Sequence, residues 1–262
     1  MKKHIVFTLG RSGSNHLANL LNAHPQVTNY GEILGDWTVP YKLYKATEPF
    51  NFSVPQYLDY IYSSQAIFYM AHAYSALSHI QKAKPVNFKL WSQVETTGVK
   101  DFSLNFIKRN IPSYLKDRED ILVINLYREN QLKRLISLKK MEASGVIALQ
   151  NKHSQVKQQR IFLDPGETIH DLQTFDMELR QHQALVEQIP EHRVLQISYE
   201  DFFGSKESQN HHREKIFSFL GVSSFEVASS HQKITPDKLD YVVENHEEIL
   251  DTLSKTEFAK YL

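Results

Sequence analysis

Short apolar runs of strand length alternate along this chain with longer segments whose apolar residues recur every three or four positions. The short runs are typical of buried strands, and the longer segments are typical of amphipathic helices. The predicted strands are His4–Leu9, Val86–Trp91, Ile121–Tyr127 and Val194–Ser198. The predicted helices are Ser14–Asn22, Val54–Lys82 (one helix or two), Phe102–Leu115, Gln131–Ala143, Thr168–Gln188, Arg213–Leu220 and Glu244–Leu253.

This alternation predicts an α/β fold, in which βαβ units build a central, mostly parallel sheet with helices on both faces. A length of 262 residues suits one such domain, so we expect residues 1–262 to fold as a unit. Two regions, at about 36–85 and 146–166, are expected to be irregular insertions into the repeating pattern, and the second follows no clear period.

Composition narrows the function classes. The chain has no cysteine, which excludes a disulfide scaffold, a thiolate metal site and a cysteine nucleophile. Because 30 Lys and Arg residues balance 30 Asp and Glu residues, a nucleic-acid partner is not expected. The 13 histidines show no metal-ligand spacing, so no metal is expected either. Without a recognisable signal peptide or an apolar run of membrane length, the chain is expected to be cytoplasmic.

The strongest local motif is a glycine-rich turn between the first predicted strand and the first predicted helix. It reads Gly10-Arg11-Ser12-Gly13-Ser14-Asn15-His16. Such a turn directs backbone N–H groups and the positive end of a helix dipole at one place, which suits a phosphate or sulfate group. The residues alone leave open a simple capping turn. The lysine of nucleoside-triphosphate loops follows neither glycine.

Residues beyond this turn extend the pattern. An Arg-Ser-Gly-Ser sequence precedes an apolar helix, a His-Pro pair and a Gly-Glu pair, at Arg11–Ser14, Leu17–Leu21, His24–Pro25 and Gly31–Glu32. This order resembles the opening of sulfotransferases that use 3′-phosphoadenosine 5′-phosphosulfate (PAPS). The resemblance is closest to the nodulation-factor sulfotransferases, which act on carbohydrates. Tyrosylprotein sulfotransferases are similar over the same stretch.

Three later segments carry the resemblance over nearly the whole chain. Tyr127–Asn130, followed by Ser137, resembles the 3′-phosphate motif of these enzymes. Val194–Asp201 resembles their strand ending in Tyr-Glu-Asp, and the tail from Lys233 to Tyr261 resembles the closing helix of the nodulation type. The resemblance implies a three-layer, P-loop-like sulfotransferase fold, with PAPS as co-substrate.

The resemblance also implies roles for individual residues. Glu32 would be the general base, and Arg128 with Ser137 would hold the 3′-phosphate. The implied cofactor-binding set is Arg11, Ser12, Gly13, Ser14, Asn15, His16, Arg128, Ser137, Tyr199 and Lys233. The implied catalytic set is Glu32, Arg11, Lys89 and His16.

Several of these residues also have a plainer interpretation. Glu32 on its own is an ordinary solvated loop acid, and Arg128 is a surface charge beside a helix. Lys89, which interrupts the run at 86–91, either stabilises the sulfuryl group or simply reaches solvent at a sheet edge. His16 either faces the sulfuryl group or lies on a helix surface.

The acceptor side is indicated by an aromatic concentration between residues 30 and 74, where eight of the 13 tyrosines lie. Aromatic faces suit sugar rings and other amphipathic acceptors, although most of these residues are expected to pack helices against the core. The basic residues Lys152, Lys157 and Arg160 either serve an anionic acceptor or form a solvated face.

Together these features predict an enzyme that transfers a sulfuryl group from PAPS to an acceptor hydroxyl, in line and with Glu32 as base. The expected acceptor is a carbohydrate or a lipo-oligosaccharide. Two alternatives remain open. One is a P-loop-type nucleoside or sugar kinase, against which the missing loop lysine counts. The other is a nucleotide-binding protein of the same fold without catalytic activity.

Overall fold

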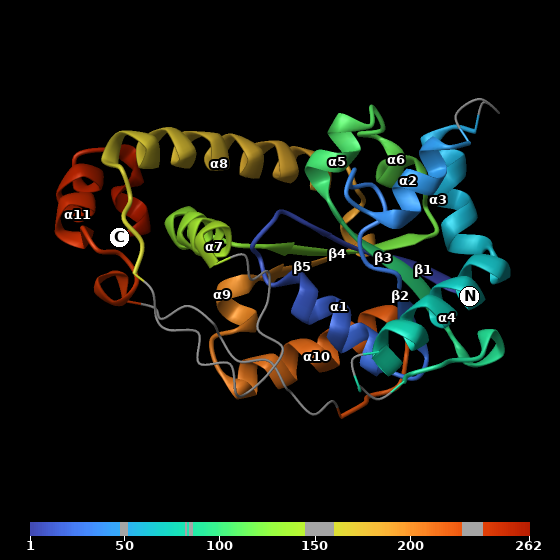
Figure 1. Cartoon of the computed structure of the whole chain (residues 1–262). Coiled ribbons are helices and arrows are strands. Elements are labelled where there is room, and N and C mark those ends of the chain that lie inside the picture. Colours follow the sequence, from blue (N-terminus) through green and yellow to red (C-terminus); the bar gives the residue numbers. More distant parts are fainter. Residues whose placement is uncertain (48–51, 82, 84–85, 145–159, 227–237) are drawn as a thin grey trace.

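One parallel sheet organises the molecule (Figure 1). The computed structural model describes residues 1–47, 52–81, 83, 86–144, 160–226 and 238–262. Within these residues the strands are β1 (Lys2–Thr8), β2 (Val27–Asn29), β3 (Thr96–Phe102), β4 (Ile121–Tyr127) and β5 (Val194–Ser198). Their order is β2-β3-β1-β4-β5, and all neighbours pair in parallel. The predicted α/β class with a parallel sheet is confirmed.

Helices cover both faces of the sheet, as Figure 1 shows. One face packs against α1 (Ser14–Ala23), α9 (Tyr199–Phe202) and α10 (Lys206–Leu220). The other packs against α2 (Val39–Lys45), α3 (Val54–Ser63), α5 (Ser103–Lys108), α6 (Tyr114–Asp117) and the end of α8 (Pro165–Val186). Successive strand residues point to opposite faces, so Ile5 and Phe7 enter one core and Val6 enters the other.

A third apolar cluster lies beyond the sheet, where α7 (Gln131–Ser144) and α8 meet α11 (His246–Ser254). The other helix is α4 (Gln65–Gln81), and 3₁₀ turns lie at η2 (Trp91–Gln93), η3 (Glu191–Arg193), η4 (Leu239–Tyr241) and η5 (Glu257–Tyr261). No helix in the described ranges is long and apolar enough to cross a membrane.

Three of the four predicted strands are confirmed, and the strand predicted at Val86–Trp91 is wrong. Residues 86–90 have no regular structure, and two strands were not predicted: the three-residue β2 and the longer β3. The composition of β3 concealed it, because two threonines, a glycine, a lysine and an aspartate leave little apolar signal. Gly98 of β3 is required by packing: a Cβ there would lie 2.3 Å from the His4 ring of β1.

Two other expectations need correction. The helix predicted over Phe102–Leu115 is broken into α5 and α6, because Asn110 adopts a left-handed conformation (φ 57°) and Pro112 follows it. The region at about 36–85 is largely helical rather than irregular: α2 lies in it, and the helical prediction at Val54–Lys82 is confirmed as two helices, α3 and α4. Most of the second insertion, residues 145–159, lies outside the described residues.

Candidate active site

A cavity of about 1830 Å³ opens at the carboxyl ends of the central strands. Its lining includes Gly10 after β1, Lys100 near the end of β3, Arg128 after β4 and Tyr199 after β5. Parallel sheets bind ligands at this edge because the connections that follow each strand converge there. The same cavity continues between α1 on one side and α3 and α4 on the other.

The glycine-rich turn forms one end of this cavity. Arg11 and Gly13 both adopt positive φ angles, 67° and 80°, and a Cβ on Gly13 would lie only 2.6 Å from the Phe203 ring. The Ser12 hydroxyl is buried beneath the turn, where it donates to the Leu9 carbonyl (2.8 Å) and lies 2.5 Å from the Thr8 hydroxyl. The side chain of Ser12 therefore shapes the turn from below and does not line the cavity.

The predicted 3′-phosphate pair lies beside the turn. The Nε and Nη2 atoms of Arg11 donate to the Ser137 hydroxyl at 3.1 and 3.0 Å. Arg128, only 5% exposed, donates from Nη1 to the Arg11 carbonyl (3.3 Å) and stacks over the Tyr199 ring at 4.3 Å. Burial lowers the pKa of Arg11 from its ordinary value, and a bound anion would oppose that effect. Two guanidinium groups and a hydroxyl thus converge at one place.

Arg134 is a further residue of this end that the sequence analysis missed. It lies on α7, donates from Nε to the Gly10 carbonyl at 2.9 Å and pairs through Nη2 with Glu178 of α8 at 2.6 Å. It also lines the cavity. The available signal was its position three residues before Ser137, which places both on one helix face.

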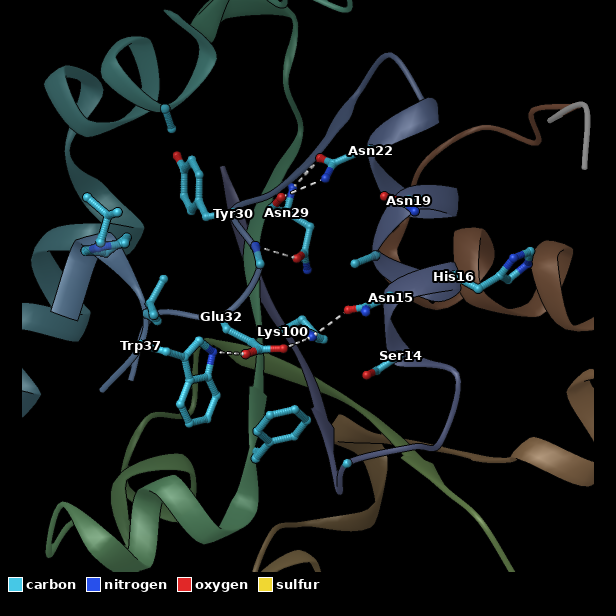
Figure 2. Close-up of a pocket in the computed structure, with 18 of the residues that line it drawn as sticks. Ser14, Asn15, His16, Asn19, Asn22, Asn29, Tyr30, Glu32, Trp37 and Lys100 are labelled. Carbon is cyan, nitrogen blue, oxygen red and sulfur yellow. Dashed lines mark hydrogen bonds and ion pairs between the residues drawn. The ribbon is translucent and has the colours of Figure 1, made fainter. Parts of the chain in front are cut away.

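Glu32 lies farther along the cavity, in the segment that follows β2 (Figure 2). Its Oε1 atom is paired with the ammonium group of Lys100, a side chain that is 3% exposed. Its Oε2 atom accepts a hydrogen bond of 2.8 Å from the indole nitrogen of Trp37. Lys100 also donates to the Asn15 amide oxygen at 2.8 Å, so it connects Glu32 to the first turn of α1.

The backbone around Glu32 is held on both sides. Asn29 accepts a hydrogen bond from the Gly31 amide at 3.0 Å, where Gly31 has a φ of 75°. The buried Asp101 carboxylate accepts from the amides of Ile33 (2.9 Å) and Leu34 (2.8 Å). Burial raises the pKa of Asp101, and these donors oppose the rise. The backbone before and after Glu32 is therefore fixed by buried polar side chains.

Lys89, predicted as a candidate catalytic residue, also lines the cavity, but its described partners are backbone carbonyls and not Glu32. Its ammonium group donates to the carbonyls of Asn22 (2.7 Å), His24 (2.8 Å) and Val27. These carbonyls lie at the end of α1 and the start of β2, so Lys89 joins the two elements. The lysine beside Glu32 is Lys100. A Lys-Asp pair at the end of a β-branched run was the signal for it.

Lys89→Met is accordingly expected to reduce stability and to leave nucleotide binding unchanged. The substitution leaves buried carbonyls without a donor, which costs about 1–3 kcal/mol. Denaturant unfolding measures this loss, with Lys116→Met, at an exposed lysine, as the matched control. A Lys89→Met protein that unfolds like the Lys116→Met protein would contradict the structural role.

Other predicted site residues differ in their placement. Ser14 and Asn15 line the cavity. His16 also lines the cavity, but its ring packs against Phe202 and Phe203 at 5.7 and 5.1 Å, and Figure 2 shows it on the side of α1 away from Glu32. Lys233 lies outside the described residues.

The aromatic residues between 30 and 74 divide between the core and the cavity. Five of the rings are buried in the core: Tyr41, Tyr44, Tyr57, Tyr62 and Phe68. Three cavity-lining rings remain strongly exposed, namely Trp37 (58%), Tyr60 (47%) and Tyr74 (67%). Figure 2 shows Asn15, Asn19 and Asn22 following one another along α1 in this part of the cavity.

Comparisons of this chain with known proteins find similar solved structures but no similar sequences. The sequence matches no protein-family model and no curated protein. Among solved structures, the chain is similar to a sulfotransferase from Alicyclobacillus acidocaldarius, with 11% identity, a TM-score of 0.46 and coverage of 97% of this chain and 94% of that one. It is also similar to the sulfotransferase domain of the Synechococcus PCC 7002 olefin synthase (13% identity, TM-score 0.44, coverage 98% and 92%).

A third similar structure is the sulfotransferase domain from the curacin biosynthetic pathway, with 16% identity, a TM-score of 0.42 and coverage of 86% of this chain and 75% of that domain. Identities and TM-scores this low do not assign a function. The functional proposal therefore depends on the residues of the cavity.

Proposed function

We propose that this protein is a sulfotransferase that transfers a sulfuryl group from PAPS to an acceptor hydroxyl. The observation that carries the proposal is that one cavity joins an anion-binding end, with Arg11, Arg128 and Ser137, to a paired carboxylate and ammonium, Glu32 and Lys100. PAPS carries phosphate groups at two positions, and the arginines and the serine of the anion-binding end can bind them. Proton removal from a hydroxyl needs a base such as Glu32.

The anion-binding end fits this donor. The buried guanidinium group of Arg128 and the half-buried one of Arg11 meet the turn that begins α1, and the first amides of a helix have no partner within the helix. Arg128 and Ser137 would hold the 3′-phosphate, while Arg11 and the turn amides would hold the 5′ end. When bound, PAPS supplies the sulfuryl group and a phosphate as its leaving group.

Glu32 and Lys100 account for the chemistry at the other end. The acceptor oxygen forms a bond to sulfur, and its proton passes to the Glu32 carboxylate. The bond between sulfur and the phosphate oxygen breaks, and its electron pair leaves on that oxygen. Lys100 bridges Asn15 at the start of α1 and Glu32, so its positive charge lies between the turn and the base. That charge opposes the negative charge that grows during transfer.

The cavity walls support a carbohydrate or lipo-oligosaccharide acceptor. The amides of Asn15 and Asn19 can donate to and accept from sugar hydroxyls. The Asn22 amide already bonds the Asn29 backbone at both ends and has one further N–H to donate. The facing helix α4 contains no Asp, Glu, Lys or Arg, and it contributes Ile67, Met70 and Tyr74 to the lining. An uncharged acceptor with hydroxyl groups and an apolar surface matches walls of this kind.

Thermal unfolding with nucleotides distinguishes the sulfotransferase from a kinase. The desulfated product, 3′-phosphoadenosine 5′-phosphate (PAP), is expected to raise the melting temperature by several degrees, since ligand at 100 times its Kd stabilises by about 2.7 kcal/mol. ATP with Mg²⁺ at the same concentration is expected to have a much smaller effect. The reverse order would favour the kinase.

Transfer of labelled sulfate from PAPS to neutral oligosaccharides such as chitotetraose then tests catalysis. PAP binding without transfer to any acceptor, and without PAP formation in water, would favour the binding protein.

A further inference from the structure

Trp37 is a large apolar side chain held in an exposed position at the cavity. It is 58% exposed, yet its indole nitrogen donates to Oε2 of Glu32 at 2.8 Å (Figure 2). The ring also lies 6.2 Å from the Phe102 ring at the end of β3. A single exposed ring is ordinary on a protein surface, but a ring that is hydrogen-bonded to a cavity carboxylate has a defined orientation.

The turn before Trp37 is built to hold the ring in place. A Cβ on Gly35 would lie 2.6 Å from the indole, so glycine is what lets the ring lie against the backbone. Thr38 closes the turn by donating its amide and its hydroxyl to the Gly35 carbonyl, at 2.9 and 2.8 Å. Asp36 is anchored to α5 and the residue that follows it, through Lys108 at 2.7 Å and Arg109 at 2.8 Å.

The charge on Asp36 is part of this anchor. Hydrogen bonds from Lys108 and Arg109 hold the pKa of the Asp36 carboxyl below its ordinary value. Arg109 also donates to the Leu34 carbonyl at 3.0 Å. The whole segment between Glu32 and Trp37 is therefore fastened to neighbouring elements, and the indole cannot be regarded as a freely rotating surface group.

The two carboxylate oxygens of Glu32 differ in their hydrogen-bond partners and therefore in how well each can act as a base. Oε1 is paired with the buried ammonium of Lys100, and an oxygen that accepts from a cation is the poorer base. Oε2 accepts only a neutral N–H among the described contacts, on the exposed side of the site. A carboxylate oxygen has lone pairs for two donors, so Oε2 can hold the indole and still accept a proton from a hydroxyl.

We propose that Trp37 is a positioning residue that aims Oε2 of Glu32 at the acceptor, with Gly35 as the residue that seats the indole. This proposal depends on the proposed function, in which Glu32 is the base. It assigns the proton to Oε2 and makes the sequence Gly35-Asp36-Trp37 part of the acceptor side of the site.

Three variants test the proposal through PAP formation from PAPS, measured with water as the acceptor and again with chitotetraose. Trp37→Phe keeps a ring and removes the N–H, and Gly35→Ala keeps the indole and displaces it. Both are expected to lower kcat about tenfold without changing the KM for PAPS. Trp91→Phe is the matched control, because Trp91 packs against Phe68 at 5.2 Å and does not line the cavity.

A spectroscopic readout separates positioning from general damage. The chain has two tryptophans, so the nitrogen-15 spectrum contains two indole N–H signals, and Trp91→Phe assigns them. The Trp37 signal is expected to move in Glu32→Gln and Gly35→Ala proteins, while the Trp91 signal stays. An unmoved Trp37 signal in Glu32→Gln would overturn the proposal, as would Trp37→Phe and Gly35→Ala proteins with the kcat of Trp91→Phe.

The same measurements distinguish failure of the proposed function from failure of the Trp37 proposal. A Glu32→Gln protein that forms PAP at the wild-type rate would reject Glu32 as the base, whatever the indole signals show. A Glu32→Gln protein that is inactive beside a fully active Trp37→Phe protein would reject Trp37 alone.

Discussion

Glu32→Gln is expected to lower the rate of sulfuryl transfer by about 10² to 10⁴, the usual contribution of a positioned general base. Glutamine keeps the shape of the side chain and can still accept from Trp37, but it cannot take the acceptor's proton. The affinity for PAP is expected to stay unchanged, because the described partners of Glu32 are Lys100 and Trp37, not the guanidinium groups of the anion-binding end.

The measurement is release of PAP from PAPS at saturating donor, with calorimetry of PAP binding beside it. Glu119→Gln is the matched control, since it makes the same change at an exposed residue between α6 and β4. A Glu32→Gln protein as fast as the Glu119→Gln protein would remove Glu32 from the mechanism. Loss of PAP affinity together with rate would instead show that the substitution disturbs the whole cavity through Lys100.

Arg128→Met is expected to weaken PAP binding by at least about thirtyfold, the effect of removing one partner of a buried charge pair. The affinity for adenosine 5′-monophosphate, which lacks the 3′-phosphate, is expected to change little. The preference for PAP over this nucleotide therefore falls. The physical reason is that Arg128 is buried, and its guanidinium is held by Tyr199, the Arg11 carbonyl and, at 3.9 Å, Glu200.

Lys139→Met provides the control for Arg128→Met. It removes one positive charge from α7, where Lys139 pairs with Asp171 at 3.0 Å outside the cavity. Calorimetry with both nucleotides on both proteins gives the comparison. Equal losses for PAP and adenosine 5′-monophosphate in the Arg128→Met protein would show that Arg128 does not read the 3′-phosphate.

The strands that the sequence predicted correctly are the apolar ones. β1, β4 and β5 are short apolar runs, because a parallel strand covered on both faces needs apolar side chains in both directions. β3 was not predicted because its buried side chains include polar ones, which are satisfied by contacts with the neighbouring strands. Thr96 hydrogen-bonds to His4 at 2.9 Å, which satisfies a polar pair inside the sheet.

The identity of the lysine beside Glu32 could likewise not be predicted from the apolar pattern. Lys89 interrupts an apolar run, whereas Lys100 lies in a strand with little apolar signal, so the apolar pattern pointed to Lys89. Only the register of β3 against β1 and the path of α1 place Lys100 beside Glu32 and Lys89 on three backbone carbonyls. Which carbonyls and carboxylates a lysine can reach depends on contacts 60 or more residues away in the chain.

By itself, the sequence determined the features that depend on near neighbours in the chain: the strand, glycine-rich turn and helix around Arg11, the strand that ends before Arg128, and Ser137 one helix later. The tertiary structure alone decided that Arg11 contacts Ser137, that Lys100 pairs with Glu32 and that Trp37 holds the other carboxylate oxygen. Turn and helix signals are local because backbone hydrogen bonds span a few residues. Side-chain pairs in a parallel sheet are not local, because each strand returns to its neighbour only after a crossover whose packing sets the register.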